Sequence, residues 1–430
     1  MTSIRRSTGL PNYDATHARR DFLSSLGVLS AAGIIPRGAW ASSADPIEAG
    51  GRSGRARGLA SAPGDFLFAP GLVYLQTGSL GPTPRPVMEQ TIAAWKELEL
   101  NPARYGYEEH EHAMDDVRAK AAAFLGCKTE ELVLTKCTTD GMNWTAQGLA
   151  LTTGDRVLTT DQEHPGGRCC WDYVARRYGV VLDIVPIPPG ENDAQAIIDR
   201  FAQRIAPRTR VLSFSHLLSS TGLRMPVAAL SALARSRGCV VVVDGAQAVG
   251  GETVDVKALG CHVYATSGHK WLLAPKGTGL LYLSEEVRTT VDPISLQDGR
   301  MAYSHSSGVP SIPSVLGLGT AIDYIMGIGT ARIEQYNIAL RNRLFAALQG
   351  VPKLRVVSAP PGPLTSPLLT YALPDAIDSV AFHQRMRDKH KIELKVVPKE
   401  WLNGNRVSTH LFNTEQDVDA LVAALKVELV

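Results

Sequence analysis

The 430-residue sequence is poor in cysteine, poor in aromatic residues and almost free of net charge. Its six cysteines are scattered, without a CxxC pair or a finger-like spacing, so they indicate neither a disulfide framework nor a metal site. The 44 Lys and Arg residues nearly balance the 42 Asp and Glu residues, which leaves a net charge of +2. This balance gives no electrostatic reason to expect binding to nucleic acid or to an anionic membrane.

Three common catalytic signatures are also missing. The sequence contains no G-x-S-x-G, HExxH or P-loop pattern. It therefore lacks the motifs that usually indicate a serine hydrolase, a zinc peptidase or a nucleoside triphosphatase. We therefore expect no metal site, and we look for chemistry in residues that follow predicted strands.

Residues 17–41 have the layout of an export signal. The twin arginine Arg19–Arg20 precedes a short apolar stretch, which ends on the small-x-small pattern Ala39-Trp40-Ala41. This resembles a twin-arginine (Tat) signal. We expect residues 1–41 to direct the protein to the periplasm or the exterior and to be removed, leaving no membrane anchor. Residues 42–62 are expected to form a flexible linker. The alternative to a signal is a disordered tail in which the Arg19–Arg20 pair occurs by chance.

From about residue 130, short β-rich runs alternate with helical patterns. This order is typical of parallel βαβ units, with helices on both faces of a sheet. The pattern changes near residue 325, where a long helix leads to shorter strands and a closing amphipathic helix. We expect a large domain over 63–325 and a small α+β domain over 326–430. The strands expected in the large domain are 131–136, 155–160, 180–187, 210–216, 239–247, 263–270 and 277–284.

Polar residues follow several of these strands, and ligands gather at that edge of a parallel sheet. Asp244 follows the apolar run Val240–Val243, where a carboxylate is costly without a positive partner. Taken singly, the other residues have ordinary interpretations as helix caps, a structural histidine or a solvated lysine. The full set is Thr138, Thr139, His164, Asp244, Gln247, Ser267, His269 and Lys270.

Pyridoxal phosphate explains this set as a whole. Lys270 would form the Schiff base and, once displaced by a substrate amine, would act as the local general base. Asp244 would keep the ring nitrogen protonated, and His164 would stack on the ring. Gln247 would donate to the phenolic oxygen of the ring. The phosphate would be held by Thr138, Thr139, Ser267 and His269.

The segments "VVVVDGAQAVG" and "SGHKWLLAPKGTGLLY" resemble the class V aminotransferases, a family of fold-type I pyridoxal phosphate enzymes. "EHPGGRCCW", "STGLRMPV" and "NRVSTHLFNTEQDVDAL" are similar to further family segments, so the resemblance covers most of residues 70–425. It implies a large domain with a mostly parallel seven-stranded sheet, a smaller α+β domain and a homodimer. It also implies that Arg406 binds the substrate carboxylate, which suits a planar guanidinium. The segment "HKWLLAPKGTG" looks most similar to the isopenicillin N epimerase-like subgroup.

The resemblance implies an enzyme that acts at the α-carbon of an amino acid or peptide-like amine. Transamination, epimerisation and elimination would share Lys270 and Asp244 and differ in the pocket walls. A C–S lyase on a sulfur-containing amino acid and a non-catalytic pyridoxal phosphate-binding protein are the alternatives. Cysteine desulfurases need a nucleophilic cysteine in a late loop. No cysteine follows Cys261, which disfavours a persulfide route.

Overall fold

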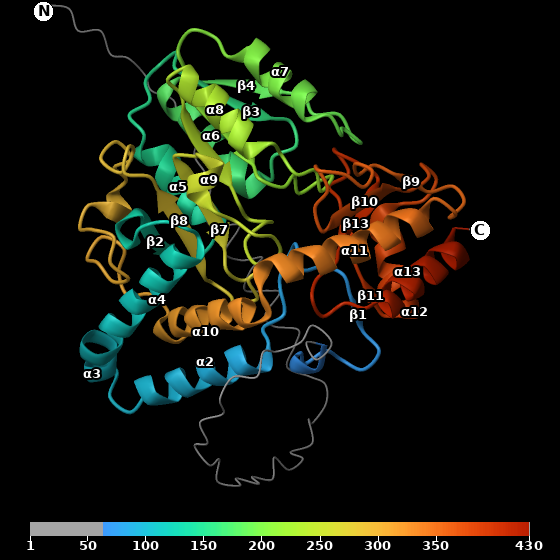
Figure 1. Ribbon diagram of the computed structural model, residues 1–430, viewed down its shortest axis with the longest axis horizontal. Coiled ribbons are helices and arrows are strands. Elements are labelled where there is room, and N and C mark those ends of the chain that lie inside the picture. Colours follow the sequence, from blue (N-terminus) through green and yellow to red (C-terminus); the bar gives the residue numbers. More distant parts are fainter. Residues whose placement is uncertain (1–62, 430) are drawn as a thin grey trace, which may run out of the picture. The chain divides into compact units, whose positions relative to one another are not determined.

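The computed structural model of the chain describes residues 63–429 (Figure 1). The predicted signal over 1–41 and the predicted linker over 42–62 lie outside the described residues.

All seven expected strands of the large domain are present in one sheet, in the order β2-β8-β7-β6-β5-β3-β4. β8 runs antiparallel to both of its neighbours, and the other pairs are parallel. This confirms the α/β fold with a mostly parallel seven-stranded sheet. The strands are β2 (Leu132–Thr135), β3 (Arg156–Thr160), β4 (Val181–Val185), β5 (Thr209–Ser215), β6 (Val240–Asp244), β7 (Val263–Ser267) and β8 (Gly279–Leu283).

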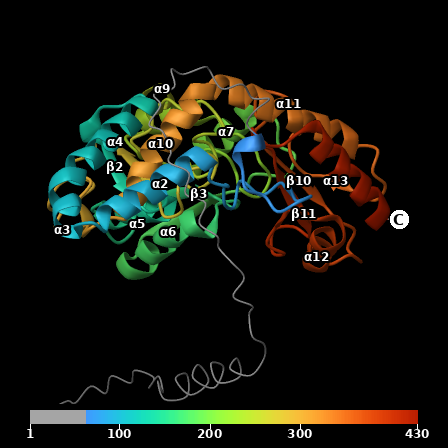
Figure 2. The same ribbon diagram turned by 90° about the horizontal axis from the view of Figure 1, so that it is seen from below.

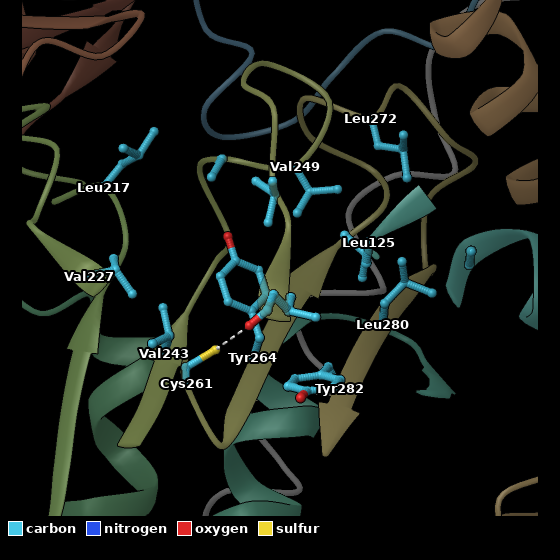
Figure 3. Packing of buried hydrophobic residues seen from close by; sticks show 14 of the residues in the cluster. Leu125, Leu217, Val227, Val243, Val249, Cys261, Tyr264, Leu272, Leu280 and Tyr282 are labelled. Carbon is cyan, nitrogen blue, oxygen red and sulfur yellow. Dashed lines mark hydrogen bonds between the residues drawn. The ribbon is translucent and has the colours of Figure 1, made fainter. Parts of the chain in front are cut away.

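Helices cover both faces of this sheet, which explains the unbroken apolar run of β6. Val242 packs in the cluster beneath α5 (Thr138–Gly148) and α6 (Pro165–Tyr178). Val243 faces the opposite cluster, which also contains Val227, Tyr264 and Leu280 (Figure 3). That second face is covered by α4 (His110–Phe124), α7 (Ala194–Arg204), α8 (Val227–Ser236), α9 (Val256–Leu259) and α10 (Ile312–Ile328). Because both faces are buried, every residue of the strand can be apolar.

The long helix expected after residue 325 is present as α11 (Thr330–Leu348). A second helix, α10, directly precedes it, ending at Ile328, and Gly329 separates the two helices with φ +98°. α10 lies beside α2 (Arg85–Leu98) in both views (Figures 1 and 2). Within residues 63–429, no single helix is long and apolar enough to cross a membrane, and α10 and α11 pass that test only together, as a pair bent by 74°. Shorter helical turns are α3 (Pro102–Arg104), a π-turn at Tyr105–Glu109 and 3-10 turns at Thr129–Glu131 and Ile294–Leu296.

A second, smaller sheet carries the C-terminal α+β region. Its order is β12-β13-β10-β9, and all of its pairs are antiparallel. Helices α11, α12 (Ser379–His390) and α13 (Glu415–Glu428) pack on one face of it (Figures 1 and 2), toward which Val407 and Leu369 point. Arg406 precedes Val407 in an alternating strand, so it points to the opposite face. The strands are β9 (Arg355–Val356), β10 (Leu368–Ala372), β12 (Lys395–Val396) and β13 (Gly404–Ser408).

The first described segment is tied to this C-terminal region. β1 (Val73–Tyr74) pairs in parallel with β11 (Ile392–Glu393). A few residues later, the N–H of Gly78 donates to Ser408 Oγ at 3.1 Å. The chain therefore passes the small sheet before it enters the large one, and Gly78 lies at the site described next.

Candidate active site

One cavity of about 410 Å³ gathers all nine residues that the sequence predicts for the site. Its walls come from the carboxyl ends of strands in the large sheet, from the segment around Gly78, and from β12 and β13. A larger cavity of about 540 Å³, next to Lys257 and Tyr282, contains none of them. The cavity is also lined by residues for which the sequence predicts no role, namely Gly78, Ser79, Cys137, Gly166, Gly167, Ser219, Ala246 and Lys395.

Lys270 is half-buried, three residues beyond the end of β7. The N–H of Gly81 donates to the carbonyl of neighbouring His269 at 2.8 Å, which fixes the backbone here. Burial lowers the pKa of the Lys270 ammonium to about 8, although the negative charge of Asp244 opposes this shift. A lysine with such a pKa is neutral far more often near pH 8 than a solvated one, and a neutral amine is the nucleophilic form.

Asp244 ends β6, and its carboxylate is buried in the same cavity. Oδ1 accepts a hydrogen bond from the N–H of Ala246 at 2.9 Å. Burial raises the pKa of the carboxyl group, while this hydrogen bond and the charge of Lys270 act in the opposite direction. Within residues 63–429 no Lys or Arg side chain forms an ion pair with it. A protonated ring nitrogen would supply the missing positive partner.

Glu163 and His164 follow β3, and their surroundings differ. Glu163 accepts hydrogen bonds at 2.6 Å from the hydroxyls of Thr160 and Ser215, and burial raises its pKa to about 7. His164 caps α6, because its Nδ1 accepts the N–H of Gly166 at 3.0 Å. Partial desolvation and the nearby positive charges of Lys270, Arg406 and Lys395 lower the pKa of the exposed His164 to about 4, so the imidazole is neutral near pH 7. A neutral ring suits the stacking role that the sequence predicts for it.

The predicted phosphate contacts meet at the start of α5. The N–H of Thr138 donates to Ser267 Oγ at 3.0 Å, and the two hydroxyl oxygens lie 2.8 Å apart. The first N–H groups of a helix and its dipole favour an anion at this position. His269 lies 3.1 Å from the carbonyl of Thr278 through Nδ1, so Nδ1 carries a proton. Thr139 also lines this cavity.

Gln247 is held by two fixed neighbours. Its Nε2 donates to the carbonyl of Gly78 at 2.8 Å, and its Oε1 accepts from Nε1 of Trp271 at 2.9 Å. These contacts define which end of the amide is the donor, and one Nε2 hydrogen remains for a ligand. Trp271 is itself fixed by His410, whose Nε2 lies 2.8 Å from the Trp271 carbonyl.

Arg406 enters the cavity from β13. Its guanidinium donates to the carbonyl and the hydroxyl of Ser219 at 2.7 and 2.8 Å, while its buried Nε has no hydrogen-bond partner. Burial lowers the pKa of Arg406 to about 10, which leaves it charged at neutral pH. Lys395 is its register partner on β12 and lines the same cavity. Neither Lys395 nor Ser219 could be assigned from sequence.

The residues present fit pyridoxal phosphate. A buried acid, a half-buried lysine of lowered pKa and a hydroxyl-bearing helix start all line one cavity. Its glycines leave space that a side chain would fill. A methyl group at Gly167 would come within 2.2 Å of Asp244 Oδ2, and one at Gly166 would come within 2.7 Å of Thr139 Oγ1.

Known proteins share this sequence pattern. The family described as aminotransferase class V matches residues 73–421. The isopenicillin N epimerase of Amycolatopsis lactamdurans is 32% identical over 83% of this chain and 95% of its own length. That of Streptomyces clavuligerus is 30% identical over 85% of this chain and 96% of its own. A cysteine desulfurase of Klebsiella pneumoniae is 31% identical over 73% of this chain and 82% of its own.

Solved structures share the fold. A C-DES variant with glycine covalently linked to the pyridoxal phosphate cofactor aligns with a TM-score of 0.76 at 24% identity, over 85% of this chain and 98% of its own. The apo structure of a cysteine desulfurase from Thermococcus onnurineus NA1 aligns with the same TM-score and identity. The alignment covers 88% of this chain and 99% of that chain.

Proposed function

Because the chain belongs to the class V aminotransferase family, we propose that it acts at the α-carbon of an amino acid or peptide-like amine, with Lys270 as the reactive amine. It is an enzyme, and its cofactor is pyridoxal phosphate. One observation carries the proposal: Lys270, with a pKa of about 8, lines one cavity together with Asp244 and Arg406.

Each side chain has a separate task. The cofactor, when bound, supplies an electron-withdrawing ring that acidifies the α-hydrogen of the substrate. Asp244 would hold the proton on the ring nitrogen of the bound cofactor and so keep the ring electron-poor. Arg406 binds the substrate carboxylate through its fork of N–H groups and so orients the α-carbon. The Lys270 amine takes and returns the proton at that carbon, for which a pKa of about 8 is well matched to neutral or mildly basic conditions.

Epimerisation is the outcome that we propose first. Two isopenicillin N epimerases are at least 30% identical to this chain over nearly their whole length, which supports removal and return of the α-hydrogen as the net reaction. Transamination would use the same side chains and would need a keto acid as second substrate. The two reactions are separable by leaving the keto acid out.

Elimination at a C–S bond is the second candidate, supported by the likeness to cysteine desulfurases. A persulfide route needs a protein thiol near the substrate. Cys137 does line the cavity, but it precedes Thr138 at the predicted phosphate site and lies on a different element from Arg406. We therefore favour elimination without a protein thiol within this candidate. Release of pyruvate or ammonia from cysteine or cystine, without added keto acid, would identify it.

The test begins with the purified protein and its visible absorption band. Wild type is expected to bind pyridoxal phosphate, and the band should change when a substrate amine is added. Lys270→Ala should lose the absorption band that depends on the lysine and the catalysed exchange of the α-hydrogen, although an added amine can still react with cofactor that remains bound. Lys276→Ala is the matched control, because Lys276 donates to Thr83 Oγ1 at 2.8 Å outside the cavity. Incubation in D₂O then reports α-hydrogen exchange. An unchanged spectrum in Lys270→Ala would reject the proposal.

Two further expectations rest on residues outside the described range or on family likeness. We propose that residues 17–41 export the folded, cofactor-loaded protein by the Tat route, and that the enzyme is a homodimer. Cell fractionation with and without Arg19→Lys and Arg20→Lys tests the first. Light scattering of the purified protein tests the second. An uncut cytosolic precursor would reject the export proposal, and a monomer would reject the dimer.

A further inference from the structure

Arg406 and Lys395 are adjacent cations on one face of the small sheet. They are register partners in antiparallel β13 and β12, so their Cβ atoms lie about 5 Å apart and their side chains share a face. That face meets the large sheet, since Thr370, which pairs with Arg406 on its other side, donates to the Ser220 carbonyl at 2.7 Å. Like charges placed directly opposite one another destabilise a sheet. A site that keeps such a pair is suited to an anion.

Lys395 and Arg406 carry charges that are not paired with a carboxylate in the part of the chain that the structure describes. Burial lowers the pKa of Lys395, and the charge of Arg406 lowers it further. The carboxylate that lines the cavity is that of Asp244, which is assigned to the ring nitrogen. The cavity therefore has more positive than negative side chains, with Lys270 as a third cation.

The cofactor phosphate does not account for Lys395 either. The predicted phosphate contacts, Thr138 and Ser267, lie at the start of α5 and the end of β7 in the large sheet. Lys395 instead projects from the small sheet beside Arg406, where the proposed function places the substrate carboxylate. We infer that Lys395 binds a second carboxylate, and that the substrate is a dicarboxylic amine. This inference rests on the proposed function.

A neighbouring cavity limits where that second carboxylate can lie. A space of about 330 Å³ is lined by Gln162, Thr221, Val397 and Trp401, among others. The segments 161–164, 219–221 and 395–397 contribute to both cavities. The adjoining space also contains the acidic side chains of Asp161 and Glu400. Those charges disfavour a carboxylate there, so the second carboxylate stays at Lys395.

L-Glutamate and L-glutamine test this inference because they match in size and differ in charge. We expect the holoenzyme to bind L-glutamate about tenfold more tightly than L-glutamine at low ionic strength, as read from the cofactor absorption band. Lys395→Met should reduce this ratio to about one by weakening L-glutamate binding alone. Lys399→Met is the matched control, because Lys399 pairs with Asp378 at the surface, and it should keep the full ratio.

A second measurement does not depend on the reaction. Calorimetry with glutarate and butyrate, which lack the amine, should show tighter binding of glutarate to wild type and no such preference in Lys395→Met. If Lys395→Met folds poorly, Lys395→Arg should keep the preference and Lys395→Gln should lose it. Equal binding of both amino acids by wild type, or a preserved ratio without the lysine, would overturn the inference alone. A holoenzyme that responds to neither amino acid and binds glutarate no better than butyrate would also overturn the inference, whereas the proposed function is rejected separately, by an unchanged spectrum in Lys270→Ala.

Discussion

The backbone of Gly167 lies against the carboxylate of Asp244, so that a methyl group on Gly167 would come within 2.2 Å of Oδ2. Asp244 ends a buried strand, and its other oxygen already accepts the Ala246 N–H. Gly167, in the first turn of α6, and Asp244, the predicted partner of the ring nitrogen, thus pack closely against each other. Any side chain at residue 167 must move one of them.

Gly167→Ala is therefore expected to weaken pyridoxal phosphate binding by about tenfold or more, since a displaced carboxylate loses its contact with the ring nitrogen. Dialysis followed by absorbance measures the retained cofactor. Gly327→Ala is the matched control, because a methyl group there meets nothing within 4 Å and alanine favours the helix. It should keep the cofactor and an equal or higher melting temperature. Cofactor affinity equal to wild type in Gly167→Ala would contradict the packing argument.

Asp244→Asn removes the charge and keeps the shape of the side chain. We expect kcat/KM to fall by about a hundredfold or more, because the neutral amide cannot hold the ring nitrogen proton as strongly. The melting temperature of the cofactor-free protein should not fall, since a buried carboxylate of raised pKa is replaced by a neutral group. Steady-state kinetics and thermal unfolding report the two effects separately. Full activity in Asp244→Asn would remove this residue from the site.

Glu163 predicts a pH dependence of stability. Burial raises its pKa from 4.5 to about 7 in the folded protein, so the folded state binds a proton more tightly than the unfolded state. The free energy of unfolding should fall as the pH rises from about 4.5 to 7, and level off above that range. Glu163→Gln should lack this contribution, with a difference from wild type that changes by about 3 kcal/mol across the range. Urea unfolding at several pH values measures it, and parallel curves would show that Glu163 titrates normally.

Lys270 predicts how the cofactor-free protein takes up pyridoxal phosphate. Its pKa is lowered from 10.5 to about 8, so the neutral amine should predominate above that pH. The rate of cofactor uptake should rise between about pH 7 and 9 and then level off. Stopped-flow absorbance can follow it. A rate that continues to rise beyond about pH 10 would indicate a solvated lysine instead.

The sequence predicts the large sheet and most of the site because those signals are local. Val240–Val243 identifies a strand buried on both faces, and Asp244 then falls at its carboxyl end. The role of Lys395 could not be predicted from the sequence. β12 is only two residues long, and which of its side chains face the cavity is set by its register with β13. Ser219 was missed for a related reason. Its contact with Arg406 joins residues 187 positions apart, and no local pattern encodes such a distance.

The pairing of Val73–Tyr74 with Ile392–Glu393 has a consequence for biosynthesis. The early strand must remain without its partner while the ribosome makes nearly the whole chain. Gly78 and Arg406 face the same cavity, so that cavity cannot close around a cofactor during translation. Capture of the cofactor is thus a late event, and a transport route that accepts finished proteins is compatible with it, whereas threading an unfolded chain would separate the two walls again.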